Sequence, residues 1–382
     1  MHVETLSLIN LRNHADSRLR FAAGVNVLHG ANGQGKTSVL EALALCALSR
    51  SFVQCPDAAL LRRGADEMSV AAEAISDLNA PWRVQIHYQP GRRKKISSST
   101  GKNQSPRDII GEMPLVVLSP DFRGVTNGPP AERRALLDTV LAQSSKRYAA
   151  EAISLKHILK QRNALLHQGK VQGRLDRMLL EPWTDALIAT GAEIVVRRAK
   201  FVARFGDYAR RAYARIADGA EDVEVRYQPH SVPAETFDGD GRLELTDVMA
   251  AYRAALQRRA KEEERRGVTL VGPQKDEVEL MVAGGSAREG ASQGQHKSLL
   301  IGIKLAEFDF LRDVRNETPL LLLDDVFSEL DRQRAARVLD AVRSDAQTFI
   351  TTTEAGLFEA HFAGAGAHAL FAVRGGQVEQ EK

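Results

Sequence analysis

The hydrophobic pattern at the start of the chain alternates in the way that β-strands do and then changes to helical spacing. Leu6 and Leu8 alternate with polar neighbours, and Leu19 and Phe21 do the same. The apolar segment 25–28 runs directly into glycine, and apolar residues between 40 and 47 then recur three and four positions apart. Strict alternation predicts half-buried strands, and the wider spacing predicts a helix. We therefore expect several strands around a strand–loop–helix unit.

The middle of the chain changes from strands to helices. Alternation predicts a strand at 82–88, and a fully apolar run predicts a buried strand at 115–118. From Pro129 to about Arg266 the pattern is mostly helical, with a long helix that is expected to start near Pro182. The charged run Lys261–Arg266 is interpreted as a solvated end of a helix.

Strand signals return in the last third of the chain. Strands are expected at Val268–Val271, at 278–282 and at 320–323, and a helix with apolar positions between 299 and 314 precedes the last of them. Strands at both ends of the chain with helices between them indicate an α/β fold that is interrupted by a helical insertion.

Composition narrows the class of protein but does not identify a partner. The chain has 382 residues, 43% of them hydrophobic and 26% charged, which is typical of a globular protein. Its longest apolar run, Ala42–Leu48, is far shorter than the roughly 20 residues of a membrane span, and no secretory signal precedes it. Two cysteines, Cys46 and Cys55, cannot build a disulfide framework, so a cytoplasmic protein is expected. A net charge of +3 means that any basic surface must come from local clustering.

The strongest chemical signal is the segment Gly-Ala-Asn-Gly-Gln-Gly-Lys-Thr at 30–37, which matches the phosphate-loop pattern G-x-x-x-x-G-K-[ST]. Glycines allow backbone N–H groups to converge on phosphate oxygens, and the following helix directs its positive end at the anion. Lys36 is expected to neutralise the outer phosphates and to act in catalysis, and the Thr37 hydroxyl is expected to ligate Mg²⁺. The residues expected to hold ATP are Gly30, Ala31, Asn32, Gly33, Gln34, Gly35, Lys36, Thr37 and Ser38.

A pair of acidic residues follows the apolar strand at 320–323. Asp324 and Asp325 are expected to emerge at the carboxyl end of this strand, where open α/β sheets bind their ligands. Asp324 is expected to hold Mg²⁺ through water, and Asp325 is expected to orient or deprotonate the attacking water.

Two further segments complete the order of motifs along the chain. Ser-Gln-Gly-Gln at 292–295 precedes a long helix, and Ser-Glu-Leu-Asp at 328–331 follows the acidic pair. Together with the phosphate loop, this order resembles that of ABC-type and SMC-like ATPases. The resemblance implies an α/β ATPase head of the ABC/SMC type. It also implies that Ser292, Gly294 and Gln295 bind the nucleotide held by a second copy, so that ATP drives homodimerisation.

The segment Asn10–His14 is similar to the N-terminal motif of SMC-like DNA-repair ATPases, which implies that Arg12 contacts phosphate. The large separation between Lys36 and Asp324 fits the RecF family, small SMC-like heads without a long coiled coil. The strings that agree with this family lie at 48–52, 118–122, 128–138, 161–166 and 320–331.

The resemblance implies a domain organisation and a function. The head would comprise residues 1–120 and 267–382, and a helical lobe would comprise residues 121–266. RecF proteins bind ATP and DNA and act with RecO and RecR to help load RecA at single-stranded gaps and junctions, which places them in DNA repair and replication. Two alternatives stay open: a P-loop ATPase or kinase without a DNA role, and a transporter ATPase subunit. A kinase would not need the segments at 292–295 and 328–331, and a transporter subunit would lack the helical insertion.

The chain departs from the family pattern at three places. Gly272–Glu277 differs from the usual GPHRDD turn, Asp325 stands where ABC enzymes usually have Glu, and no histidine lies near 351–353. The last two departures favour slow hydrolysis, and therefore a switch or clamp with weak ATPase activity.

The basic residues suggest one DNA-binding surface. Arg92, Arg93, Lys94 and Lys95 follow the strand at 82–88 and could bind DNA phosphates without reading bases, although an ordinary solvated turn explains them equally well. The pairs Arg133-Arg134 and Arg197-Arg198 are interpreted as charges on helix surfaces.

Overall fold

The structure is a computed structural model that describes residues 1–53, 55–217, 221–237, 243–330, 332–342, 346–354 and 367–381. The chain forms two compact units, one of Met1–Arg123 with Leu300–Lys382 and one of Gly124–Leu299. The first boundary lies close to the expected one. The second lies well after residue 266, because strand β10 (Glu277–Val282) pairs with strand β9 (Val223–Gln228) inside the second unit.

The first unit contains an antiparallel sheet with the strand order β2-β1-β4-β5-β6-β7. Its members are β1 (His2–Leu11), β2 (His14–Arg20), β4 (Met68–Ile75), β5 (Pro81–Tyr88), β6 (Lys95–Ser98) and β7 (Gly101–Gln104). Residues on β1 and β5 alternate between buried and solvent-facing positions, as the sequence pattern predicts.

The second sheet of this unit is parallel except for one edge strand, with the order β15-β14-β3-β13-β12-β8. Its members are β3 (Val25–His29), β8 (Leu115–Leu118), β12 (Leu320–Asp324), β13 (Thr348–Thr352), β14 (His368–Arg374) and β15 (Gln377–Gln380). Strands β8 and β12 are buried along their length, which is typical of parallel sheets and confirms the two apolar runs as core strands. Because β3, β12 and β13 run in parallel, their carboxyl ends share one edge of the sheet.

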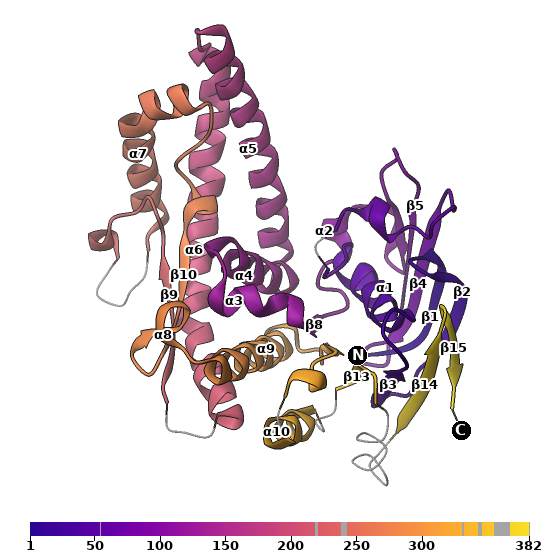
Figure 1. Cartoon of the computed structure of the whole chain (residues 1–382). Helices are drawn as coiled ribbons and strands as arrows, with labels where there is room; N and C mark the ends of the chain where they lie inside the picture. The colour runs from indigo at the N-terminus through magenta and orange to yellow at the C-terminus, as the bar shows by residue number, and fades with distance from the viewer. Residues whose placement is uncertain are drawn as a thin grey trace. The chain divides into compact units, whose positions relative to one another are not determined.

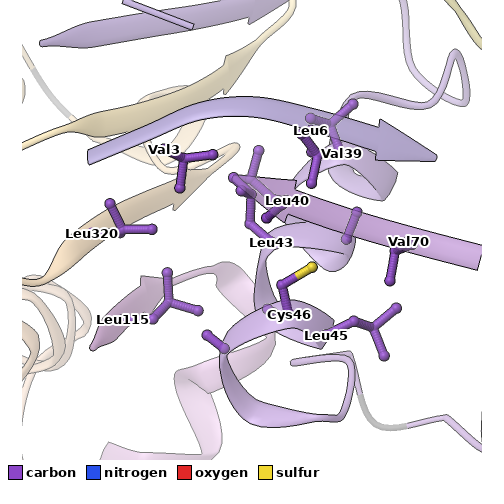
Figure 2. Close-up of a cluster of buried hydrophobic side chains, with 14 of the residues drawn as sticks. Val3, Leu6, Val39, Leu40, Leu43, Leu45, Cys46, Val70, Leu115 and Leu320 are labelled. Carbon is purple, nitrogen blue, oxygen red and sulfur yellow. The ribbon is translucent and has the colours of Figure 1, made fainter. Parts of the chain in front are cut away.

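Helix α1 (Lys36–Leu48) connects the two sheets of this unit, because it contacts β1, β4 and β5 of one and β12 and β13 of the other. A helix packed on both sides must be apolar all round. Figure 2 shows Leu40, Leu43 and Cys46 of this helix among side chains from β1, β4, β8 and β12. The remaining helical segments of the unit are η1 (Asp57–Leu60), α2 (Pro106–Ile109), η2 (Pro120–Arg123), η5 (Phe327–Glu329) and α10 (Arg332–Val342), and α9 (Gln293–Arg315) continues into it from the second unit.

The second unit is built on long helices with a small sheet of order β11-β10-β9 (Figure 1). Its helical segments are α3 (Gly124–Asn127), α4 (Pro130–Ser144), α5 (Lys146–Gln172), α6 (Arg177–Ile216), η3 (Ala234–Thr236), α7 (Leu245–Arg266), η4 (Pro273–Lys275) and α8 (Ala287–Gly290), and its third strand is β11 (Gly285–Ser286). The expected start of the long helix near Pro182 is wrong. Helix α6 begins at Arg177, because the Asp176 side chain caps it by accepting from the N–H groups of Met178 and Leu179.

Two other expectations for this unit fail at the end of α7. Glu263, inside the charged run at 261–266, is buried and forms an ion pair of 2.7 Å with buried Arg162 of α5. Residues 268–271 form no strand, because the N–H groups of Thr269 and Leu270 donate to the side chains of Asn163 and Glu263. A backbone N–H group that donates to a side chain is not available for the hydrogen bonds between strands.

Candidate functional site

The phosphate-loop segment lies between strand β3 and helix α1, as the sequence predicts. Gly30 and Gly35 have positive φ angles of 146° and 111°. A Cβ atom at Gly30 would lie 2.4 Å from the carbonyl oxygen of Val373, and one at Gly35 would lie 2.6 Å from Asn13 Oδ1. Only glycine meets both requirements. The loop therefore delivers the first N–H groups of α1 to the edge of the parallel sheet, where an anion would be stabilised.

Lys36 is the first residue of α1 and its side chain folds back over the loop. Its ammonium group donates to the carbonyl oxygens of Gly30 at 2.7 Å and Ala31 at 2.9 Å. Burial lowers the pKa of Lys36, while the nearby carboxylates of Asp325 and Asp324 oppose that shift. The positive charge is thus held within the loop by backbone dipoles, close to two acidic residues.

The two predicted magnesium ligands lie in direct contact although 287 positions of the sequence separate them. The Thr37 hydroxyl donates to Asp324 Oδ1 at 2.8 Å, and the Thr351 hydroxyl donates to the same oxygen at 2.7 Å. Strand pairing explains the second bond, because Asp324 on β12 lies opposite Thr351 on β13. Burial raises the pKa of Asp324. A hydroxyl and a carboxylate at one edge of a sheet are the hard oxygen donors that Mg²⁺ selects, so the residues fit this ion.

Asp325 has an unusual backbone conformation. Its φ angle is 48°, in the left-handed region that Asp adopts more readily than most residues. Its N–H group donates to Thr351 Oγ1 at 2.9 Å, and its carbonyl oxygen accepts from Ser328 at 2.8 Å. Thr351 therefore touches both members of the acidic pair. This threonine was not predicted as a site residue. The only feature of the sequence that could have pointed to it is the run of threonines at 351–353, which no histidine follows.

Arg12, the predicted phosphate contact, forms a bidentate ion pair with Glu41 of α1. Its Nη2 and Nε atoms lie 2.7 and 3.0 Å from the two oxygens of that carboxylate. The hydrogen bonds to Glu41 raise the pKa of Arg12. Glu41 is buried and also accepts from the Ser51 hydroxyl at 2.7 Å. Glu41 was not predicted because it looks like one more polar residue of a helix; only the fold brings it to Arg12.

The predicted signature segment is in the second unit, at the start of helix α9. The Ser292 hydroxyl accepts from the N–H group of Gln295 at 3.2 Å, and the Gln295 side chain accepts from the N–H group of Ser292 at 2.8 Å. This reciprocal arrangement is a capping box, which fixes the direction of the first helical turn. Ser292 is exposed, while Gly294 and Gln295 are half-buried. Asp331, the last residue of the segment at 328–331, lies outside the described residues.

Of the predicted DNA-binding residues, Arg92, Arg93 and Lys94 lie in the turn between β5 and β6, and Lys95 is the first residue of β6. Arg92, Arg93 and Lys95 are exposed. Lys94 forms an ion pair of 3.0 Å with Asp57 and also donates to the carbonyl oxygen of Ser49. Lys94 therefore differs from its neighbours, because its charge already anchors the turn to the segment after α1.

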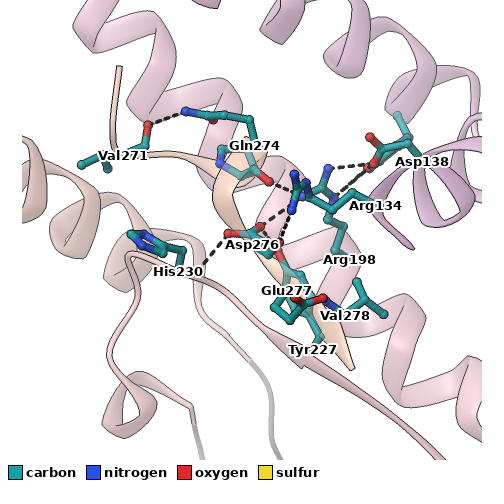
Figure 3. Close-up of polar contacts among 12 residues, drawn as sticks. Arg134, Asp138, Arg198, Tyr227, His230, Val271, Gln274, Asp276, Glu277 and Val278 are labelled. Atoms are coloured by element: carbon teal, nitrogen blue, oxygen red, sulfur yellow. Dashed lines mark hydrogen bonds and ion pairs between the residues drawn. The ribbon is translucent and has the colours of Figure 1, made fainter. Parts of the chain in front are cut away.

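The interpretation of two arginine pairs as surface charges was also wrong for one member of each. Arg133 is buried and forms an ion pair of 3.0 Å with Glu277. Arg198 is buried between Asp138 at 2.8 Å and Asp276 at 3.1 Å, as Figure 3 shows. The turn at 272–277 thus serves packing within the second unit.

Comparison with known proteins agrees with the motif order. A family model described as the RecF/RecN/SMC N-terminal domain matches residues 2–374. A DNA replication and repair protein RecF from Symbiobacterium thermophilum is 37% identical over 354 residues, which cover 93% of this chain and 92% of that protein. The RecF protein of Salinibacter ruber is 36% identical over 362 residues, 94% of this chain and 86% of that protein.

Solved structures give the same result at the level of the fold. The chain is similar to the recombination mediator protein RecF bound to ATP, from the RecFOR pathway, with a TM-score of 0.89 and 25% identity over 100% of this chain and 98% of that one. An Smc head bound to the C-terminal winged-helix domain of ScpA gives a TM-score of 0.54 at 14% identity, covering 100% and 97%. The expected ABC/SMC-like α/β ATPase head is therefore confirmed.

Proposed function

The chain belongs to the RecF family of SMC-like ATPases, and from this premise we propose that it is an ATP-dependent DNA-binding protein of recombinational repair and replication maintenance. It binds single-stranded gaps and junctions as an ATP-driven dimer and acts with RecO and RecR to help RecA loading. Slow hydrolysis resets this clamp. The proposed site of action is the cytoplasm. Separately, in the described parts of the chain, no helix combines the length and apolar character needed to cross a membrane.

The observation that carries this proposal is the contact of 2.8 Å between Thr37 and Asp324. It joins the phosphate loop to the acidic strand in one site, which a glycine-rich turn on a different kind of fold would not do. In the proposed complex Lys36 neutralises the outer phosphates, and the N–H groups of residues 30–38 bind their oxygens. Thr37 and Asp324 would hold Mg²⁺, which when bound would supply neutralisation of the phosphate charge.

Asp325 is the proposed base for the attacking water, and its geometry is consistent with slow turnover. Its side chain is one methylene shorter than the usual Glu, and its left-handed backbone is tied to Thr351 and Ser328. A base acts only within hydrogen-bond reach of the water that it deprotonates. A shorter side chain on a fixed backbone has less freedom to attain that position.

The position of Ser292 at an exposed helix start supports the proposed dimerisation. The capping box fixes the first turn of α9, and the positive end of a helix favours anionic groups. In the proposed clamp, Ser292, Gly294 and Gln295 of one copy meet the nucleotide held by the phosphate loop of the other.

Light scattering coupled to size exclusion tests the proposal with ATP, with ADP and without nucleotide. We expect a dimer with ATP and monomers in the other two conditions. Lys36→Ala should bind ATP more weakly and stay monomeric, because the loop loses its mobile cation. Lys95→Ala replaces an exposed lysine at the start of β6; it is the matched control and should dimerise normally. Unchanged ATP affinity of Lys36→Ala by isothermal titration would overturn the assignment of the nucleotide site.

A further inference from the structure

Two reverse turns hold the outer side of the phosphate loop. Asn13, in the turn between β1 and β2, donates from Nδ2 to the carbonyl oxygen of Gln34 at 2.8 Å. The N–H group of Gly376, in the turn between β14 and β15, donates to the same oxygen at 2.9 Å. His14 is fully buried, and its Nε2 atom lies 3.0 Å from the carbonyl oxygen of Gly35. The carbonyl oxygens of Gln34 and Gly35 therefore both have partners on this side of the loop. These oxygens belong to the peptide units that carry the N–H groups of Gly35 and Lys36.

A peptide unit is planar and trans, so its carbonyl oxygen and its N–H group point in opposite directions. Holding the Gln34 oxygen therefore sets the direction of the Gly35 N–H group, and holding the Gly35 oxygen sets that of the Lys36 N–H group. A donor on the carbonyl also polarises the amide and strengthens the N–H group as a donor. Both effects act on the groups that would bind phosphate.

We infer that His14 is a positioning residue for nucleotide binding: it fixes the peptide unit between Gly35 and Lys36 so that the Lys36 N–H group faces the phosphates, and Asn13 does the same for Gly35. This inference rests on the proposed nucleotide site. It gives the last two residues of the Asn10–His14 segment a task separate from that of Arg12.

The hydrogen-bond partners of His14 define which ring nitrogen carries the proton. The Gly35 oxygen can only accept, so Nε2 must be the protonated nitrogen. Nδ1 lies 2.9 Å from the Ser17 hydroxyl, which is also 3.1 Å from the carbonyl oxygen of Gly376. Burial lowers the pKa of His14, which favours a neutral ring with one proton. Ser17 thus links the histidine to the second turn.

The close packing around these contacts leaves no room for a looser arrangement. A Cβ atom at Gly35 would lie 2.7 Å from His14 Nε2, and one at Gly376 would lie 2.3 Å from the carbonyl oxygen of Asn13. Real Cβ atoms do not approach other atoms so closely, so the phosphate loop and the β14–β15 turn both need glycine opposite Asn13 and His14. The shell that orients a binding group is effective only when it is itself fixed by packing.

Two variants of similar polarity test the role of the Nε2 donor. A glutamine at position 14 can place its amide nitrogen near the imidazole Nε2 position, whereas an asparagine reaches only as far as Nδ1. We expect His14→Asn to weaken ATP binding about tenfold, the value of one strong hydrogen bond, and His14→Gln to stay within about twofold of the wild type. Isothermal titration with ATP and Mg²⁺ measures both.

Thermal unfolding of each variant separates positioning from folding, because both substitutions place an amide in the same buried site. Asp16→Asn, on the exposed side of β2, is the matched control and should bind ATP normally. Equal ATP affinity for His14→Asn and His14→Gln at equal melting temperature would overturn the inference. A wild-type protein that fails to bind ATP at all would instead overturn the proposed function, so the two failures are distinguishable.

Discussion

Asp276 carries the most enclosed carboxylate of the cluster in Figure 3. Its side chain accepts from Arg198, from the Tyr227 hydroxyl and from the N–H group of His230. Burial is the largest influence and raises the pKa of Asp276 from 3.8 to about 6, against the opposing pull of Arg198. The folded protein therefore binds more protons than the unfolded chain between these two values.

This difference predicts how stability depends on pH. The contribution of Asp276 is fully present below about pH 4 and is lost as the pH rises through about 6, by up to about 3 kcal/mol. Asp276→Asn is neutral at every pH and keeps an acceptor for Tyr227. We expect urea unfolding to show that the variant gains on the wild type as the pH rises from about 4 to 7.

The pH dependence of the difference between the two proteins is the decisive quantity, since any fixed cost of the substitution cancels from it. Asp16→Asn on β2 serves as the surface control. A difference between wild type and Asp276→Asn that stays constant over this range would show that Asp276 is ionised throughout in the folded state.

Whether a charged side chain is solvated or paired could not be predicted from the sequence. Lys94, Arg198 and Glu263 look like solvated surface charges, because each lies in a charged run or on a helix. Each is instead held by a partner distant in the chain: Asp57, Asp276 and Arg162 respectively. Local pattern carries no information on such pairs, since the fold alone brings them together.

At the level of elements, prediction succeeds where the signal is local. The strand–loop–helix unit around Lys36 and the apolar strand before Asp324 are encoded in consecutive residues, and both are found as expected. Thr351 and Glu41 could not be predicted, because their contacts depend on strand register and on the packing of α1 against the β1–β2 turn. The strand predicted at 268–271 is absent for a related reason: the side chains of Asn163 and Glu263 bind its backbone.

The turn between β5 and β6 offers a prediction at this same scale. If Arg92, Arg93 and Lys95 bind DNA phosphates, their joint replacement by alanine should flatten the dependence of DNA affinity on salt. The slope of log affinity against log salt should fall by about 0.7–0.9 for each phosphate that the variant no longer neutralises. Fluorescence anisotropy with a gapped DNA and ATP, at several salt concentrations, measures it.

Lys94→Ala is the matched control for this turn, since it removes one charge of the same cluster that is already paired with Asp57. It should lower stability and leave the salt slope unchanged. An unaltered slope in the triple variant would exclude this turn as the DNA surface, whatever its effect on stability.

For the whole molecule, the predicted insertion begins close to the first boundary between the compact units, whereas the second boundary lies well after its predicted end. The phosphate loop and the acidic strand belong to the first unit, whereas the signature segment belongs to the second. The order of motifs along the chain is a family property and was visible in the sequence. The position at which the chain returns to the head was not visible in the sequence. Strand β10 has the pattern of a strand of the head, and only its pairing with β9 assigns it to the second unit.

The proposed clamp makes a prediction that only the assembled molecule can meet. Asp325→Asn keeps the shape of the side chain and removes the base, which typically costs about 10²–10⁴ in rate, while the contacts of Lys36, Thr37 and Asp324 remain. This variant should accumulate as an ATP-bound dimer and hold DNA longer. Ser292→Arg should bind ATP but stay monomeric, because it places bulk and charge where the two copies meet. In a mixture, one of the two composite sites of a heterodimer would carry both changes and the other would be intact, so partial dimerisation is expected. Sedimentation velocity with ATP measures all three samples. An Asp325→Asn protein that stays monomeric at saturating ATP would remove the clamp and leave only a nucleotide-binding head.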